Sequence, residues 1–157
     1  MTVSSLAVLS RTFQNTNDIG AKAVQADATM VIEGFEDMML LCKQFPWGVA
    51  TSGGVVEYFG PLGQKMGQPG QVKTMQEGPI QIYETRKNHA GEFLKNLIAA
   101  GGEFNCTVYA GRPDDYTKKE DYKKCMLVMD TPDRDWENDM QTFVLAGTMT
   151  FHWFGNQ

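Results

Sequence analysis

The sequence predicts a mainly β protein of the α+β class, with two packed antiparallel sheets forming a sandwich or barrel, one flanking helix and an extended N-terminal arm. Three observations predict this fold. Short runs rich in Val, Ile, Thr and aromatic residues recur between turns that contain Gly or Pro. One segment, about residues 88–100, has convincing helical periodicity. Strand-like runs lie on both sides of it, an order that favours packed antiparallel sheets.

The composition is that of one globular domain of 157 residues. Apolar residues make up 42% and charged residues 21%, which is ordinary for such a domain. The net charge of −5 argues against a dedicated nucleic-acid binder, because phosphate binding requires clustered Lys and Arg. No basic-then-apolar leader opens the sequence, and no run approaches the roughly 20 apolar residues of a membrane span. We therefore expect a protein made in a reducing cytoplasm, with no membrane partner.

Three cysteines lie far apart in the sequence, at Cys42, Cys106 and Cys125. Each falls in a predicted strand between apolar residues, so we expect three reduced thiols in or near the core. The odd number also disfavours a closed set of disulfides.

The sequence divides into an N-terminal arm, residues 1–27, and a β domain, residues 28–157. The arm is polar from residue 11, and we expect at most a helical turn or two in it, with Leu6 and Leu9 on one side of a short helix over 2–10. Gly60–Gly70 holds four glycines and two prolines and is predicted to be a long, mobile loop. The strands predicted before the helix are 29–33, 37–45, 55–59, 71–76 and 80–85.

The helix over 88–100 is predicted to carry Phe93, Leu94, Leu97 and Ile98 on one face, with Asn88 as its N-cap. Strands 104–110, 122–130 and 140–154 are predicted after it. The last of these is about twice the usual strand length of roughly 5–6 residues, and Gly147 predicts a bend or bulge in it. Unpaired strand edges recruit neighbours, so a strand of this length indicates a large sheet, which other subunits could complete.

Every template for chemistry fails. In the Gly-rich segment Lys65 is followed by Met66, where a phosphate-binding loop requires Ser or Thr. The acidic stretch 133–139 lacks the Gly and Glu of a calcium loop, and the histidines, His89 and His152, have no zinc-ligand spacing. No nucleophile has an evident base beside it. We expect no enzyme, no metal and no cofactor.

Aromatic and apolar residues instead predict contacts between subunits, where Trp and Tyr are over-represented. Trp47 lies in a connection in which a large apolar cluster is hard to bury within one subunit, and both an intersubunit and a core position remain open for it. The intersubunit candidates are Phe45, Pro46, Trp47, Tyr58, Phe59, Leu62 and Met66.

In this order the elements resemble the tail tube proteins of contractile-tailed bacteriophages. The matching segments resemble the family's opening hairpin, its Pro-Gly exit, the segment that follows, the strand before the helix and the paired closing strands. The resemblance covers about residues 28–154, and the arm and the acidic loops carry no family-specific feature. The segments are 30–43 (MVIEGFEDMMLLCK), 45–48 (FPWG), 56–63 (VEYFGPLG) with the Gly-rich stretch after it, 71–73 (QVK), 80–84 (IQIYE), 126–130 and 141–153.

The resemblance implies a non-enzymatic structural subunit whose copies form hexameric rings that stack into a tube. The implied partners are further copies of the chain, the tail sheath protein, the baseplate and tail terminator proteins, and double-stranded DNA that passes through the lumen without specific binding. The implied location is the tail of the virion, after assembly in the host cytoplasm. An acidic lumen would repel phosphates. The lumen candidates are Glu57, Lys73, Glu77, Gln81 and Glu84.

Three alternatives remain open. A baseplate tube-initiator protein and a type VI secretion inner-tube protein share the implied fold and differ in the assembly they serve. The alternative of a different class is a small-molecule-binding β-barrel module, or an enzyme on a split barrel, with Gly60–Gly70 as its lid.

Overall fold

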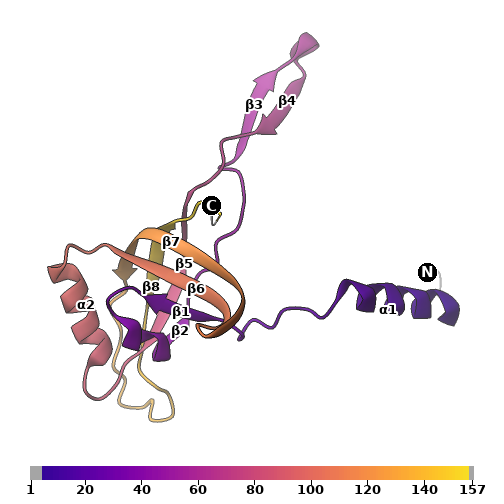
Figure 1. The fold of residues 1–157 in the computed structure, drawn as a ribbon. Coiled ribbons are helices and arrows are strands. Elements are labelled where there is room, and N and C mark those ends of the chain that lie inside the picture. The colour runs from indigo at the N-terminus through magenta and orange to yellow at the C-terminus, as the bar shows by residue number, and fades with distance from the viewer. Residues whose placement is uncertain (1–4, 156–157) are drawn as a thin grey trace.

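A six-stranded antiparallel sheet forms the body of the protein in the computed structural model, which describes residues 5–155 (Figure 1). The α+β class, with antiparallel sheets and a flanking helix, is confirmed. The strand order is β1-β6-β7-β8-β5-β2, so within the described residues β1 and β2 are end strands and the sheet does not close. The six strands are β1 (Thr29–Ile32), β2 (Cys42–Gln44), β5 (Met75–Tyr83), β6 (Phe104–Arg112), β7 (Asp115–Met129) and β8 (Val144–His152).

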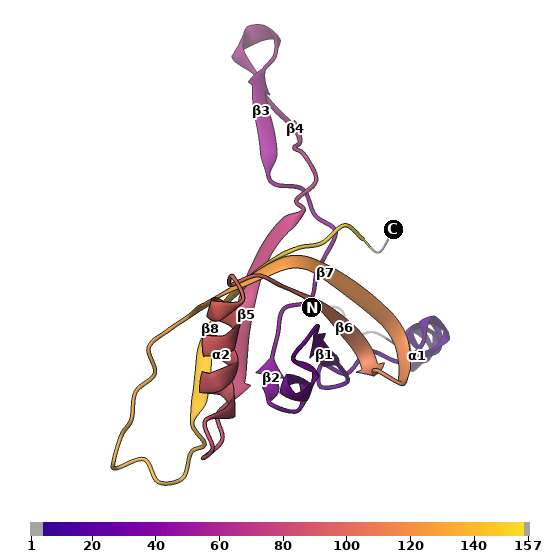
Figure 2. The ribbon, with the colours of Figure 1, turned by 60° about the vertical axis from the view of Figure 1, so that its left-hand side comes forward.

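The remaining elements surround or leave this body. Strands β3 and β4 form a separate two-stranded sheet that projects from it, and α1 extends away from it on the N-terminal side (Figures 1 and 2). They are α1 (Leu6–Ile19), the 3₁₀ turn η1 (Glu36–Leu40), β3 (Val55–Phe59), the 3₁₀ turn η2 (Pro61–Gly63), β4 (Lys65–Pro69) and α2 (His89–Ala99).

Strand β7 joins the two halves of the sheet. Its first part pairs with β6, as at Cys106 opposite Tyr122, and its last part pairs with β8, as at Met126 opposite Thr150. The register shifts between these two parts, and the strand curves across the body in Figure 2. The Tyr122 ring stacks on Phe151 of β8, with 4.1 Å between centroids. Side chains from both halves therefore fill one core.

The core holds apolar side chains from five strands, from η1 and from α2, which covers one side of the body. The Phe93 ring of α2 meets Phe35 edge-on, 5.0 Å between centroids. Ile98, predicted to lie on the same helix face, is 75% exposed instead. The buried apolar residues are Met30, Ile32, Met38, Ile80, Ile82, Ala90, Phe93, Leu97, Phe104, Cys106, Val108, Tyr122, Cys125, Leu145, Met149 and Phe151.

The predicted N-cap of α2 is at the right position, but its side chain does not cap. Asn88 adopts a left-handed conformation with φ 62°. The Glu84 carboxylate accepts hydrogen bonds from the backbone N–H groups of Ala90 (3.0 Å) and Gly91 (2.9 Å) instead. These N–H groups have no partner within the helix, and a negative charge is favoured beside them.

Helix α1 is longer than predicted. It has 14 residues, where a turn or two was expected, and it begins after Ser5, whose hydroxyl accepts from the Val8 N–H. Helical spacing continues from Leu6 and Leu9 to Phe13, which explains the longer helix. Every residue of α1 is exposed. Residues 1–4 of the predicted arm lie outside the described residues.

Two predicted strand boundaries before α2 are wrong. Residues 37–45 form η1 and the short strand β2, because the turn lets Met38 reach the core from one side. The predicted strands 71–76 and 80–85 are largely one strand, β5, which runs through Pro79. Strand β2 pairs with β5 only at Gln81 and Ile82, so β5 is an edge strand at Pro79, where a missing N–H is tolerated.

Two further loop predictions are wrong because strand pairing overrides composition. The second half of Gly60–Gly70 is β4, paired with β3 from Val55–Pro69 to Phe59–Lys65. The polar segment 111–119, which lies between the predicted strands 104–110 and 122–130 and was expected to be a loop, is mostly the start of β7, which pairs with β6.

The long C-terminal strand is shorter than predicted. Strand β8 has nine residues, so residues 140–143 precede it. Of the bend or bulge predicted at Gly147, the bulge is wrong, since the described pairing of β8 with β5 is continuous there. A Cβ at this position would collide with the carbonyl oxygen of Val128. Glycine is therefore needed for close approach of the backbones.

Candidate assembly surfaces

The hairpin of β3 and β4 presents its apolar side chains to solvent. All residues of both strands are exposed, including Val55 (71%) and Phe59 (77%). A two-stranded hairpin alone is at best marginally stable in water. The exposed ion pair between Glu57 and Lys65 (3.0 Å) adds little, because solvent screens it. Within the single chain the apolar residues of this hairpin stay uncovered.

The tip of the hairpin carries a strained leucine. Leu62 has φ 61° and is fully exposed, between Pro61 and Gly63. The left-handed conformation costs a non-Gly residue roughly 1–2 kcal/mol. A glycine or a polar residue such as Asn is the usual choice for this conformation in a solvated turn, so an exposed leucine is unusual there. The predicted intersubunit residues Tyr58, Phe59, Leu62 and Met66 all lie on this hairpin or its tip.

The other three intersubunit candidates lie just after β2, where the connection to β3 leaves the body. We call this region the base of the hairpin, and its residues pack on the body. Pro46 is buried, while Phe45 and Trp47 are partly buried and pack against the core. The Tyr122 hydroxyl accepts a hydrogen bond from the Gly48 N–H (2.7 Å) and donates one to the Pro46 carbonyl oxygen (2.9 Å). Trp47 thus has both a core-facing and a solvent-accessible part.

A buried carboxylate completes the base of the hairpin. Glu120 is 2% exposed and accepts a 2.6 Å hydrogen bond from the indole Nε1–H of Trp153. Lys118 neutralises it, with 3.1 Å between Nζ and Oε1. The Trp153 ring lies beside Gly48, where an added Cβ would come within 3.0 Å. Sequence reasoning missed this cluster, although Glu120 and Tyr122 have the i, i+2 spacing of one strand face.

Strands β7, β8 and β5 present an outward face of mixed polar and apolar side chains with few charges. Residues opposite one another in the register form rows across it, and their positions alternate with the core positions Ile80, Ile82 and Met149. Glu77 is the ionised side chain within the strands of three of these rows, and Asp130, just after β7, lies opposite Ala146. The rows are Glu77–Thr150–Met126, Pro79–Thr148–Val128 and Gln81–Ala146.

The five lumen candidates do not share this face. Glu77 and Gln81 lie on it, whereas Glu57 belongs to the hairpin and Lys73 to the exposed connection before β5. Glu84 is occupied at the N-terminus of α2.

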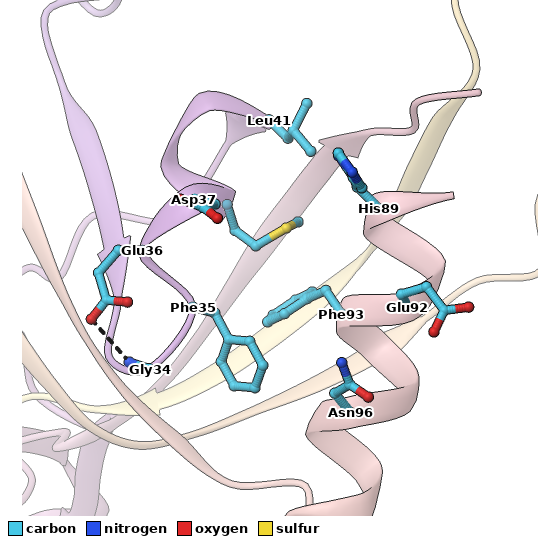
Figure 3. Close-up of a pocket in the computed structure, with 10 residues that line it drawn as sticks. Gly34, Phe35, Glu36, Asp37, Leu41, His89, Glu92, Phe93 and Asn96 are labelled. Carbon is cyan, nitrogen blue, oxygen red and sulfur yellow. Dashed lines mark hydrogen bonds between the residues drawn. The ribbon is translucent and has the colours of Figure 1, made fainter. Parts of the chain in front are cut away.

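A cavity of about 310 Å³ lies between η1 and α2. Phe35 and Phe93 form part of its apolar lining, and Glu92 and His89 lie on the α2 side (Figure 3). Glu36 accepts a hydrogen bond from the Gly34 N–H (3.3 Å). Among residues 5–155 no group of three His, Cys, Asp or Glu side chains is placed to hold a metal ion. Neither helix of that range is long and apolar enough to cross a membrane.

Comparison with known proteins places the chain by fold. No family model matches the sequence, and no curated protein matches it. Cryo-EM structures of contractile injection systems share its fold, among them the following three. A chain of the sheath–tube complex of an extracellular contractile injection system, PVC, in the extended state has TM-score 0.56 and 12% identity, over 95% of both chains.

The other two structures come from the ends of such assemblies. The tube-terminating cap of the anti-feeding prophage has TM-score 0.54 and 13% identity, over 85% of this chain and 89% of that one. The PVC sheath/tube terminator has TM-score 0.57 and 11% identity, over 85% and 94%. At these identities the likeness establishes a fold shared with contractile injection systems.

Proposed function

We propose that this chain is a structural subunit of a phage tail tube, whose copies assemble into stacked hexameric rings that form the channel for genome delivery. The observation that carries the proposal is the projecting β3–β4 hairpin, with apolar side chains exposed along its whole length. The fold shared with the sheath–tube, cap and terminator structures supports it.

The hairpin has the energetics of an assembly element. Burying a large apolar side chain contributes about 1.5–3 kcal/mol, and Val55, Phe59 and Leu62 are each more than two-thirds exposed in the single chain. Covering them on a neighbouring copy recovers that energy and also stabilises a hairpin that is marginal alone. The end strands β1 and β2 offer further backbone groups for pairing with neighbours.

The outward face of β5, β8 and β7 suits the wall of a channel. Its three central rows hold Thr, Gln and apolar side chains with the carboxylates of Glu77 and Asp130, and one lysine, Lys123, lies opposite His152 in the adjacent row. DNA adheres to proteins mainly through Lys and Arg contacts to phosphate, so this face would let it pass. In this proposal the chain works in the virion tail, after assembly in the host cytoplasm. Its partners are the sheath, baseplate and terminator proteins and the DNA in transit.

A second candidate function is that of a tube terminator or cap. The structures that share the fold include a tube-terminating cap and a sheath/tube terminator. Such a protein would form a single ring at the end of a tube.

Negative-stain microscopy of the purified full chain over a range of concentrations tests both candidates. Long tubes of stacked rings support the tail tube subunit, and single rings that never stack support the terminator. A stable monomer at every concentration would overturn both.

A double variant, Phe59→Ser with Leu62→Ser, tests the role of the hairpin. We expect it to abolish tubes while circular dichroism stays unchanged, because both side chains are exposed in the single chain. Ile98→Ser is the matched control, since Ile98 is 75% exposed and belongs to α2, which lies away from the β3–β4 hairpin (Figure 1). Tubes of normal length from the double variant would contradict the role given to the hairpin.

A further inference from the structure

Two of the three cysteines are in contact inside the sheet. Cys106 of β6 and Cys125 of β7 are 4% and 0% exposed, and their sulfur atoms lie 3.6 Å apart. They are not register partners, since Cys106 lies opposite Tyr122 and Cys125 lies opposite Phe104. A register shift between these pairs brings the two sulfur atoms together on the core side.

We propose that Cys106 and Cys125 form a modification site, at which an external small-molecule disulfide such as oxidised glutathione converts the two thiols into an intramolecular disulfide joining β6 to β7. One cysteine thiolate attacks the external disulfide and releases one small thiol. The second thiolate attacks the mixed disulfide and releases the other small thiol. The two protein thiols lose two electrons and two protons in total, and the external disulfide is reduced to two thiols.

The backbone beside the two cysteines is irregular, which allows the sulfur atoms to approach one another. A disulfide bond is about 2.05 Å long, so the sulfur atoms must approach by roughly 1.5 Å. The irregularity in β7 lies beside the pair, where Lys124 has φ 48° and its N–H donates to the Asn105 side-chain oxygen (3.1 Å). A bulged strand bends more readily than a regular one, so side-chain rotation with a small backbone shift can close the gap.

The environment of the thiols keeps them reduced until the sheet opens. The hydrogen bond with Cys125, and then burial, raise the pKa of the Cys106 thiol far above its ordinary value. Thiolate, the attacking species, is therefore scarce in the closed fold. We expect slow oxidation of the native chain and faster oxidation when the β6–β7 junction opens locally.

The third cysteine is a control within the same chain. Cys42 of β2 is half-buried, and burial raises the pKa of its thiol to about 12. It is more accessible than the pair but has no sulfur contact of its own among the described hydrogen bonds. A general oxidation would therefore modify Cys42 first, whereas the proposal requires a specific link between Cys106 and Cys125.

The experiment treats the reduced full chain with oxidised glutathione in urea below the unfolding transition, then unfolds and alkylates it. We expect a peptide that links Cys106 to Cys125 and at most one alkylated thiol per chain in place of three, since Cys42 either stays free or carries glutathione. The Cys42→Ser variant should give the same link and no alkylated thiol. The oxidised wild type should melt about 5–10 °C higher than the reduced form, and dithiothreitol should reverse the shift.

Three results would overturn the proposal. They are three alkylated thiols per chain after the treatment, a main product that links Cys42, and a lower melting temperature of the linked form. All three are measured on the wild-type chain, so a variant that fails to fold does not affect the outcome. The inference does not rest on the proposed function, because the readouts require no assembly. A tail protein that leaves the reducing cytoplasm would meet such oxidants after release.

Discussion

The hydroxyl of Tyr122 holds the base of the hairpin to the body, and the Tyr122→Phe variant tests this directly. Tyr122 is fully buried, and its ring stays in place in the variant because Phe has nearly the same shape. The change removes one atom that accepts from the Gly48 N–H at 2.7 Å and donates to the Pro46 carbonyl oxygen at 2.9 Å. Pro46 and Gly48 are themselves buried, so water cannot readily replace the lost partner.

The magnitude follows from the two hydrogen bonds. Each contributes about 1 kcal/mol net, and a buried group left without a partner costs about 1–3 kcal/mol, so we expect a total loss of about 2–4 kcal/mol. In a domain of this size 1 kcal/mol shifts the melting temperature by about 2–4 °C, which predicts a fall of roughly 5–15 °C. The Phe151 stacking contact and the apolar burial of the ring are retained.

Urea unfolding followed by far-UV circular dichroism measures the effect. The midpoint should fall while the slope stays unchanged, because the surface exposed on unfolding is the same. Tyr116→Phe is the matched control, since the Tyr116 side chain is 44% exposed, and its cost should lie within about 0.5 kcal/mol of zero. A loss for Tyr122→Phe no larger than that of the control would refute the reasoning.

Four further predictions concern the N-terminal arm, Trp47, Gly147 and the Cys42 thiol. Deletion of residues 1–27 should leave the fold intact and abolish stacking, because every described residue of α1 is exposed; tubes of unchanged length would contradict this. Trp47→Ala should weaken assembly more than it lowers the melting temperature, because the side chain is only partly buried; a lower melting temperature with normal assembly would assign Trp47 to the core. Gly147→Ala should destabilise the protein by about 1–3 kcal/mol, because the added Cβ collides with the Val128 carbonyl oxygen; an unchanged urea midpoint would show that the strands can separate without cost. Stability under reducing conditions should fall as the pH rises from about 9 towards 12, because burial raises the pKa of the Cys42 thiol from 9.0 to about 12 and the unfolded chain loses its proton first. The Cys42→Ser variant should show a smaller fall, and an equal fall would exclude this thiol as a cause.

Local sequence was sufficient to predict an element whose own residues carry the periodicity or composition of a helix or strand. Helix α2 follows the spacing of Phe93 and Leu97, which needs only a 3.6-residue period. Strands β3 and β6 are runs of apolar and β-branched residues, so their existence is visible without a partner. The failed templates for chemistry were likewise readable from spacing alone.

Composition misled where pairing decides the structure. Strand β4 contains Gly67 and Pro69, and the start of β7 is polar on both faces, so both segments have the composition of loops. Each becomes a strand because an adjacent strand supplies hydrogen-bond partners at a definite register. The opposite error occurred at η1, where apolar residues that looked like a strand form a turn that buries Met38.

The candidate assembly surfaces show the same difference between what local sequence indicates and what strand pairing decides. The apolar residues of the hairpin were chosen from composition, and they do lie together, because neighbours in sequence remain neighbours on a short hairpin. The lumen residues were chosen across several segments, and the structure separates them. Whether Glu77 and Gln81 share a face with Thr148 depends on the register of β5 against β8, which no local pattern contains.

The sequence by itself determined the fold class, helix α2, most of the strand-forming runs and the apolar character of the hairpin. These depend on periodicity and side-chain chemistry within a few residues. Only the tertiary structure decided that Tyr122 holds Gly48, that Glu84 caps α2 and that Cys106 touches Cys125. These contacts join distant parts of the chain or depend on an exact register, and packing selects that register for the whole sheet at once.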